Sequence, residues 1–265
     1  MIIIGERINS SRPAIKRAIA SQDIDFIQNE ALIQLEAGAD YIDVNAGTFY
    51  KEEEKQLAWL VKTVQSVTEK PICIDTVNPK ALLSGLKEHK GKALVNSISI
   101  EAERLKGFLP IIKEYSCRVI GLGLDDSGPP KSVEGKVKIA DSLINLLVSE
   151  GLPPEDIFID PLVHAISTDE KAALVTLQSI KVIKERHSEV NIICGVSNVS
   201  FGLPGRRKLN QVFLALAMSV GLNAAIIDPT DIEMILAQKC AEALIGQDEY
   251  CMSYLSHFRE FSEKA

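Results

Sequence analysis

Short apolar runs alternate with longer amphipathic segments along the whole chain, and this alternation constrains the fold more than any other feature of the sequence. The runs are rich in Ile and Val and lack the polar–apolar alternation of a half-exposed strand, as expected of parallel strands that are buried on both faces. We predict eight such strands, at residues 2–4, 41–44, 72–74, 93–95, 119–122, 157–159, 191–194 and 224–227.

The segments between these runs carry apolar residues at helical spacing. Leu57, Leu60 and Val64, for example, fall on one face of a helix. Pro79 suits the first turn of a helix, and Gly38 suits a helix C-terminus. The helices are predicted at residues 12–36, 52–68, 79–88, 101–115, 133–149, 169–187, 206–220 and 232–245.

Eight strands, each followed by a helix, are typical of an α/β protein of the (β/α)8 TIM-barrel type, and 265 residues is an ordinary length for one such barrel. No proline-rich or low-complexity stretch divides the chain, so we expect residues 1–265 to form a single domain. A doubly wound open sheet is the rival architecture. It usually has fewer strands and a glycine-rich turn after the first, and no such turn follows residues 2–4.

Composition and charge narrow the class of protein. The net charge of −7 and the pI near 5.3 argue against a nucleic-acid-binding protein, which normally carries a basic patch. The five cysteines are scattered without a CxxC pair, which favours reduced thiols and a cytoplasmic location. The N-terminal segment MIIIGERINSSR has an apolar run too short for a signal peptide or membrane span.

The predicted strands end on polar residues, mostly Asp and Asn. In a barrel the C-terminal strand ends meet at one mouth, where active sites of this fold lie. Any one Asp after a strand is more often a turn former or helix cap, and we interpret Asp125, Asp126 and Asp228 in this way. The complete set is too regular for caps alone: Glu6, Arg7, Asn9, Asp43, Asn45, Asp75, Asn96, Asp125, Asp126, Asp160, Ser197, Asn198 and Asp228.

The residue types at the mouth exclude several chemistries. No lysine stands at a strand end, which disfavours a Schiff-base aldolase, and the loops lack a phosphate-binding glycine pattern. Of the histidines, His164 alone lies near the mouth, so we predict no metal site; the other three are expected at the surface. Carboxylates and amides suit a planar heterocycle with paired N–H donors, such as a pterin. Asp75, Asn96 and Asp160 are the candidate set.

Six motifs carry a resemblance to a known family. They are IIIGERIN, YIDVNAG, CIDTVNP, LVNSIS, FIDPLV and GVSNVSFGLPGRR, in this order and near the first, second, third, fourth, sixth and seventh strands. Together they resemble the methyltetrahydrofolate–corrinoid protein methyltransferases, which include the folate-binding module of cobalamin-dependent methionine synthase. The resemblance spans essentially the whole chain and implies a pterin-binding barrel.

The resemblance also implies roles for residues and partners. The enzyme would exchange a methyl group between N5 of tetrahydrofolate, bound as substrate, and the cobalt of a corrinoid (cobalamin) carried by a separate protein. It would be a homodimer, and the corrinoid protein would dock at the mouth, near residues 129–131 and 200–207. The implied roles are pterin binding for Asp75, Asn96 and Asp160, catalysis near N5 for Asn198, folate contacts for Phe201 and Arg206, and support for Asp43, Asn45, Glu6 and Asn9.

Two alternatives stay open. A dihydropteroate synthase-like enzyme would share the pterin site, but its NxTPDSF-type loop is replaced here by GERINSSR, and few basic residues are available for a diphosphate. A non-catalytic folate-binding protein would keep Asp75, Asn96 and Asp160 without needing Asn198. The sequence leaves three points open: the direction of methyl transfer, the identity of the corrinoid partner with its methyl donor, and the source of the N5 proton.

Overall fold

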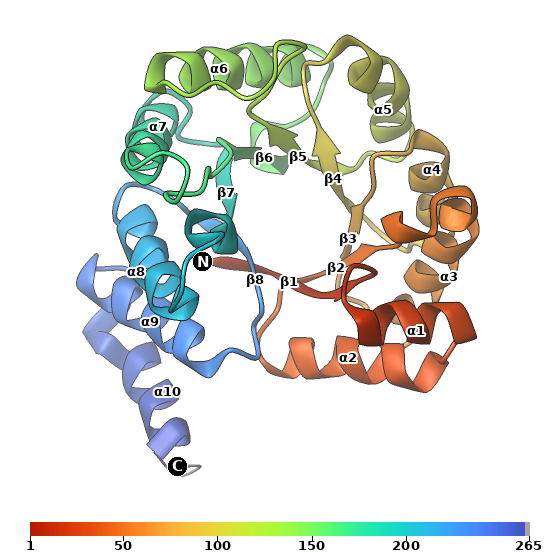
Figure 1. The fold of residues 1–265 in the computed structure, drawn as a ribbon, viewed down its shortest axis with the longest axis horizontal. Helices are drawn as coiled ribbons and strands as arrows, with labels where there is room; N and C mark the ends of the chain where they lie inside the picture. Colours follow the sequence, from red (N-terminus) through yellow and green to blue (C-terminus); the bar gives the residue numbers. More distant parts are fainter. Residues whose placement is uncertain (263–265) are drawn as a thin grey trace.

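The computed structural model describes residues 1–262, and within them eight parallel strands pair in chain order and close on themselves, with β1 beside β8 (Figure 1). Helices form an outer ring around this barrel, so the predicted (β/α)8 architecture is confirmed. The strands are β1 (Ile2–Asn9), β2 (Tyr41–Asn45), β3 (Ile72–Asp75), β4 (Leu94–Ile98), β5 (Arg118–Leu122), β6 (Ile157–Asp160), β7 (Asn191–Gly195) and β8 (Ala224–Ile227).

The helices follow the predicted segments with two differences. The segment 12–36 forms two helices rather than one, because Gln22 takes a left-handed backbone conformation (φ 53°) and Asp23 caps a new helix by accepting a hydrogen bond from Phe26 N. A C-terminal helix was not predicted. The helices are α1 (Pro13–Ser21), α2 (Ile24–Glu36), α3 (Glu53–Gln65), α4 (Pro79–Glu88), α5 (Ala102–Glu114), α6 (Val133–Ser149), α7 (Ala172–Arg186), α8 (Arg206–Ser219), α9 (Ile232–Leu244) and α10 (Met252–Ser262).

The strands separate two apolar cores. The outer core packs the strands against the surrounding helices, and the inner core fills the barrel, where the Tyr41 and Phe158 rings meet edge-on with centroids 6.4 Å apart. Because both faces of each strand are covered, the sequence of a strand reads as a continuous apolar run. The inner core is built by Ile4, Tyr41, Cys73, Leu94, Ile120, Phe158, Ile193 and Ala224.

Local sequence fixes where the helices begin, and hence where the mouth loops end. Asn78 and Ser132 accept hydrogen bonds from the first-turn amides of α4 and α6, and Pro79 occupies the predicted first turn of α4. Gly38 has a φ of 96°, a conformation that favours glycine, directly after α2. No helix among residues 1–262 is both long and apolar enough to cross a membrane.

Candidate active site

Polar side chains form a layer directly above the inner core, on the side of the C-terminal strand ends. Asp75 lies two residues beyond Cys73, and Asp160 lies two residues beyond Phe158. Asn96 of β4 pairs in register with Asp75. Since residues two apart on a strand point to the same face, these polar side chains point into the barrel where the apolar filling stops. The carboxylates that end buried strands are therefore the top layer of the barrel interior.

Asp43 lies lowest in this layer and is 3% exposed. Its Oδ1 accepts a hydrogen bond of 3.2 Å from Asn96 Nδ2, and the Cys73 thiol also donates to it. Burial, reinforced by the charge of Asp75, raises the pKa of Asp43 well above its ordinary value. Asp43 is therefore harder to ionise than an exposed aspartate, and Asn96 is tied to it by the hydrogen bond.

Asp75 is held by the neighbouring strand. Asn45 Nδ2 donates to Asp75 Oδ2 at 2.9 Å, while Asn45 Oδ1 accepts from Ser10 Oγ at 3.0 Å and from Gly47 N at 2.9 Å. These three bonds fix which way the Asn45 amide faces. Burial raises the pKa of Asp75 to about 6, against the opposing effect of the Asn45 bond. Asp75 is thus mainly ionised at neutral pH.

Asp160 lies across the barrel from Asp43 and is 7% exposed. Its Oδ1 accepts a 2.8 Å hydrogen bond from Leu162 N. Burial raises the pKa of Asp160 to about 6, while the Leu162 amide and the charge of Lys136 act in the opposite direction. Asp160 is therefore a second buried carboxylate that is ionised near neutral pH.

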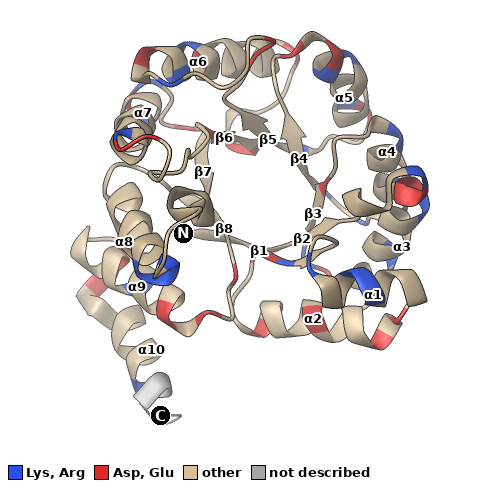
Figure 2. Ribbon diagram, viewed as in Figure 1, with Lys and Arg blue, Asp and Glu red and all other residues tan. Residues whose placement is uncertain are grey.

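Among the described residues, no Lys or Arg side chain forms an ion pair with Asp43, Asp75 or Asp160. Acidic residues mark the inner ends of β3 and β6, whereas the outer helices carry mixed charges (Figure 2). A buried carboxylate without a cation is costly unless donors reach it. The arrangement suits a ligand that brings paired N–H donors into the mouth.

The loop after β7 brings Asn198, Phe201 and Arg206 together. Arg206 Nε donates to Ser200 Oγ at 3.1 Å, its Nη2 donates to Ser197 O at 2.8 Å, and its guanidinium lies over the Phe201 ring at 5.8 Å. The Phe201 ring is nonetheless 67% exposed. This loop forms an apolar, positively charged wall of the mouth.

Asn198 stands on the 3₁₀ turn Val196–Ser200, directly after β7. Its side chain is exposed and makes no hydrogen bond to any other residue that the structure describes. Its amide lies over Gly195, where a Cβ would stand 3.2 Å from Asn198 Nδ2. The glycine therefore leaves room for an unpartnered amide at the mouth.

The rim beside β1 and β8 is a charge network rather than a carboxylate layer. Arg7 donates to Glu30 at 2.9 Å and to Asp228 at 3.2 Å, and Asp228 also accepts from Thr230 N at 3.0 Å. Asp228 thus serves as the turn former that the sequence indicated. Asp125 accepts from Ser127 N and Asp126 from Ala102 N, which are likewise turn and helix-end contacts.

Of the two β1 residues at this rim, Glu6 is influenced by burial and by nearby charges, whereas Asn9 makes only a local turn contact. Burial raises the pKa of Glu6, with the charge of Arg12 acting against it, so Glu6 belongs electrostatically with the carboxylate layer. Asn9 Oδ1 accepts from Ser11 N at 3.0 Å, which is a contact within the turn after β1. Its expected support of the pterin stays a prediction.

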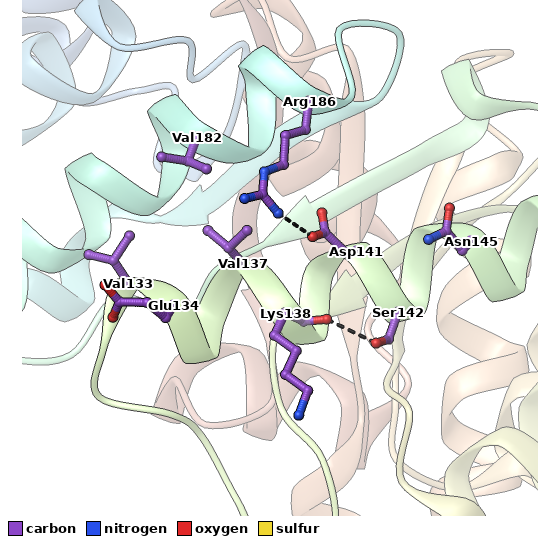
Figure 3. Close-up of a pocket in the computed structure, with 9 residues that line it drawn as sticks. All are labelled: Val133, Glu134, Val137, Lys138, Asp141, Ser142, Asn145, Val182 and Arg186. Atoms are coloured by element: carbon purple, nitrogen blue, oxygen red, sulfur yellow. Dashed lines mark hydrogen bonds and ion pairs between the residues drawn. The ribbon is translucent and has the colours of Figure 1, made fainter.

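A groove of about 510 Å³ lies outside the barrel, between α6 and α7 (Figure 3). Arg186 and Asp141 form a 2.6 Å ion pair across it. The groove contains none of the strand-end residues, and nothing in its lining suggests chemistry, so we place the site at the mouth. The lining residues are Val133, Glu134, Val137, Lys138, Asp141, Ser142, Asn145, Val182 and Arg186.

Lys136 was not predicted from the sequence as a site residue, because it lies on α6 and not at a strand end. Its side chain nevertheless reaches the end of β6. Its Nζ donates to Pro161 O and Leu162 O, each at 2.6 Å. The signal was present, because Lys136 shares the buried face of α6 with Ile139, Ala140 and Leu143. A lysine on an apolar helix face implies a buried partner.

The other three histidines were expected at the surface, but each is half-buried, and the Nε2 atom of His257 is buried. His89 is half-buried and accepts a hydrogen bond from Ile72 N at 3.1 Å, so it closes the start of β3. His187 contacts Asp141 Oδ1 at 2.8 Å. Within residues 1–262, no group of three or more His, Cys, Asp and Glu side chains is arranged to hold a metal ion.

The sequence of the barrel matches a known protein family. A family model described as pterin binding enzyme matches residues 5–228, which is most of the chain. The chain belongs to the pterin-binding enzyme family. All eight strand ends that form the mouth lie within or at the edge of the matched region.

Relatives in this family differ in how much of their length the chain covers. The methylcorrinoid:tetrahydrofolate methyltransferase of Eubacterium limosum is 38% identical over 262 residues, which is 98% of this chain and 97% of that protein. Methionine synthases of Mycobacterium leprae and Mycobacterium tuberculosis are 29% and 27% identical over 88% of this chain. The match spans 20% and 21% of their length, so this chain corresponds to one part of those proteins.

Solved structures share the fold. Dihydropteroate synthase from Xanthomonas albilineans, in complex with 7,8-dihydropteroate, superposes with a TM-score of 0.68 and 16% identity over 92% of this chain and 93% of that one. The Yersinia pestis dihydropteroate synthase gives 0.67 and 17% over 92% of each chain. At such low identity the likeness shows a common barrel fold alone.

Proposed function

We propose that this protein is a methyltransferase that moves a methyl group between N5 of tetrahydrofolate and the cobalt of a corrinoid carried by a separate protein. The carrying observation is the pair of mainly ionised strand-end carboxylates, Asp75 and Asp160, which form no ion pair with a described Lys or Arg side chain and share the mouth with an unpartnered Asn198. The similarity to the methylcorrinoid:tetrahydrofolate methyltransferase of Eubacterium limosum, which extends over nearly the whole chain, supports this proposal. The chain acts as one pterin-binding unit, residues 1–265.

The polar layer binds the pterin. The exocyclic amino group and the adjacent ring N–H of a pterin are two parallel donors, and a carboxylate accepts both in a charge-assisted pairing. Asp160 and Asp75 supply carboxylates, and Asn96 offers an acceptor and donors to the remaining ring edge. Asp43 holds Asn96, and Asn45 holds Asp75, so each contact is oriented before the ligand arrives.

Asn198 acts at N5. The corrinoid supplies the methyl acceptor or donor at cobalt, and the bond that breaks or forms on the folate is N5–CH3. When the methyl leaves, N5 keeps the electron pair and takes up a proton; in reverse, N5 loses its proton as it gains the methyl. An amide that bonds more strongly to N5 as charge develops lowers this barrier. The relative's name favours transfer from methylcorrinoid to tetrahydrofolate.

The mouth loops carry the remaining contacts. Phe201 and Arg206 line the side of the mouth where the folate extends beyond its pterin ring. The corrinoid protein docks over the same opening, and the turn at residues 129–131 and the loop at 200–207 form the nearest docking surface.

The assembly is a homodimer, and the protein works in the cytoplasm. Exposed apolar side chains near the C-terminus support self-association: Leu244 is 86% exposed, Tyr250 85% and Met252 65%. Light scattering after size exclusion tests this point, with Leu244→Asp as the variant. A monomeric parent protein contradicts it.

A methyl-transfer assay with free cobalamin tests the function. Methyltetrahydrofolate with cob(I)alamin, and methylcobalamin with tetrahydrofolate, are followed by visible absorbance for the parent, Asn198→Ala and Asn145→Ala. Asn145 lines the groove between α6 and α7, so its variant is a matched control. We expect transfer in the parent and the control, and a collapse in Asn198→Ala.

Two outcomes identify the alternatives. Tight binding of methyltetrahydrofolate without transfer, with free cobalamin and with a corrinoid protein, indicates a folate-binding protein. Condensation of p-aminobenzoate with a pterin diphosphate indicates a dihydropteroate synthase. Either result contradicts the proposed methyl transfer.

A further inference from the structure

Lys136 is a fully buried cation whose donors point at the loop after β6. The residue is 1% exposed, its Nζ donates to Pro161 O and Leu162 O at 2.6 Å each, and His164 Nδ1 lies 3.5 Å away. Two short bonds to consecutive carbonyls oblige those carbonyls to point in the same direction, toward α6. The lysine therefore sets the path of the backbone directly after Asp160.

That backbone path is unusual and is connected to Asp160. Leu162 has a φ of 60°, a left-handed conformation that a leucine rarely adopts. The Leu162 amide, on the other side of the same residue, donates to Asp160 Oδ1 at 2.8 Å. The unusual turn thus presents its carbonyls to Lys136 and its N–H to the carboxylate.

The same loop reaches the segment that carries Asn198. Ile166 N donates to Val199 O at 3.0 Å, and Ser167 Oγ donates to Phe201 O at 2.6 Å. The loop after β6 is therefore fixed by Lys136 at its start and to the Asn198 turn further on. A shift at Lys136 moves both the pterin-binding carboxylate and the loop that borders N5.

We propose that Lys136 is a positioning residue for the pterin site: it holds the loop after β6 so that Asp160 faces the ligand, and its charge acts on that carboxylate. This inference rests on the proposed function for its ligand. It assigns Lys136 no contact with the substrate, since its donors are directed to Pro161 and Leu162.

The charges around Lys136 agree with this role. Burial lowers the pKa of Lys136 to about 8, and the neighbouring Asp160 and the Cys194 thiol act in the opposite direction. Burial, together with the charges of Lys136 and Lys131, lowers the pKa of His164, although Asp169 opposes this. At pH 7 the lysine therefore carries the charge, and Asp160 is the carboxylate that its charge keeps ionised.

The test compares Lys136→Met with Lys184→Met. Lys184 is a matched control, because its Nζ also donates to two carbonyls, Ser188 O and Val190 O, each at 2.8 Å, but at the opposite end of the barrel. Binding of methyltetrahydrofolate is measured calorimetrically from pH 5 to 9. In parallel, the Asp160 carboxyl is titrated by ¹³C NMR, with its signal assigned from Asp160→Asn.

We expect Lys136→Met to move the acid midpoint of binding, and of the Asp160 titration, upward by about one pH unit. Lys184→Met should leave both midpoints unchanged even where it lowers the unfolding temperature. Lys136→Arg, which keeps a cation, should restore the parent midpoint. Unchanged midpoints in a folded Lys136→Met overturn the proposal, because a merely structural lysine would lower stability alone.

Lys136→Gln replaces the methionine variant if that one fails to fold. If neither folds, the Asp160 signal of the parent should respond again near pH 8, as Lys136 loses its charge, and should not do so in Lys136→Arg. The absence of that response overturns the proposal. A parent that binds no pterin contradicts the proposed function, whereas the Asp160 titration still decides whether Lys136 acts on Asp160.

Discussion

The two ends of the barrel differ in whether their buried carboxylates are paired with cations. At the bottom, Asp156 is 4% exposed but pairs with both Lys92 and Arg118, and the N-terminal amino group lies 2.9 Å from Glu242 Oε1. At the mouth, Asp160 is similarly buried and Asp75 is partly buried, and neither has an ion-pair partner among the described residues.

This difference separates residues that stabilise the fold from the residues that we propose bind the ligand. A carboxylate paired with cations favours folding, whereas burial that raises a carboxylate's pKa opposes folding wherever the group is ionised. The unpaired carboxylates at the mouth therefore lower the stability of the fold, and the ion pairs at the bottom of the barrel offset part of this loss. Variants at the two ends should have opposite effects on stability and on ligand binding.

The largest effect is expected for Asn198→Ala, at the mouth. Loss of one transition-state donor in other enzymes lowers kcat by roughly 10²–10³-fold, and we expect the same here, with little change in the Kd for methyltetrahydrofolate. Gly195→Ala should give a smaller decrease in kcat, since its Cβ would stand 3.2 Å from the Asn198 amide. Single-turnover methyl transfer measures both. An equal loss of affinity in Asn198→Ala would show that the amide binds rather than catalyses.

Asp160→Asn should separate binding from stability. The variant loses a charge-assisted pairing, so affinity should fall by roughly 10–100-fold. Because Asp160 is ionised at pH 7 and its pKa is raised from 3.8 to about 6, removing the charge should raise the free energy of unfolding by about 3 kcal/mol. Urea unfolding and calorimetry on the same preparation check the two effects. A destabilised Asp160→Asn contradicts the comparison.

Asp156→Asn, at the bottom of the barrel, should lower stability and leave ligand affinity almost unchanged. Its partners are partly exposed, at 38% for Lys92 and 31% for Arg118, so we expect a loss of about 2 kcal/mol rather than the full effect of breaking a buried pair. The Kd for methyltetrahydrofolate should stay within about twofold. A large change in Kd would mean that the two ends are coupled through the barrel.

The smallest effects are expected from pH. As pH falls from 7 through about 6, Asp75 and Asp160 bind protons, so affinity for the pterin should decrease. Both groups have an ordinary pKa of 3.8 and a higher one in the folded protein, so between about pH 4 and 6 the folded state binds more protons than the unfolded one. Their contribution to stability therefore rises as pH falls. Subtracting the unfolding free energies of a double Asn variant isolates this contribution, and the opposite sign would refute the assignment.

The sequence predicted the barrel because its strands are buried on both faces and so appear as uninterrupted Ile and Val runs. It also placed Asp75 and Asp160 at the mouth, because each directly follows a predicted strand and the C-terminal strand ends of a barrel meet at one mouth. The break at Gln22 was not predicted, because the apolar spacing continues through it and a single Asp, Asp23, is a weak sign of a new helix start. Lys136 was missed because its role depends on a loop that a different segment supplies.

Asn198 carries an amide at the mouth rather than a carboxylate or an ammonium group. Transfer in the two directions requires two kinds of hydrogen bond to one nitrogen: N5–H must donate to an acceptor, and the methylated N5 must accept from a donor. A carboxylate offers the first alone and an ammonium the second alone, but an amide carries an acceptor and a donor on one rotatable group. Since no neighbour among the described residues holds the Asn198 side chain, half a turn about its last torsion angle exchanges one for the other. If Asn198 acts at N5 as proposed, the same side chain serves methyl transfer in either direction.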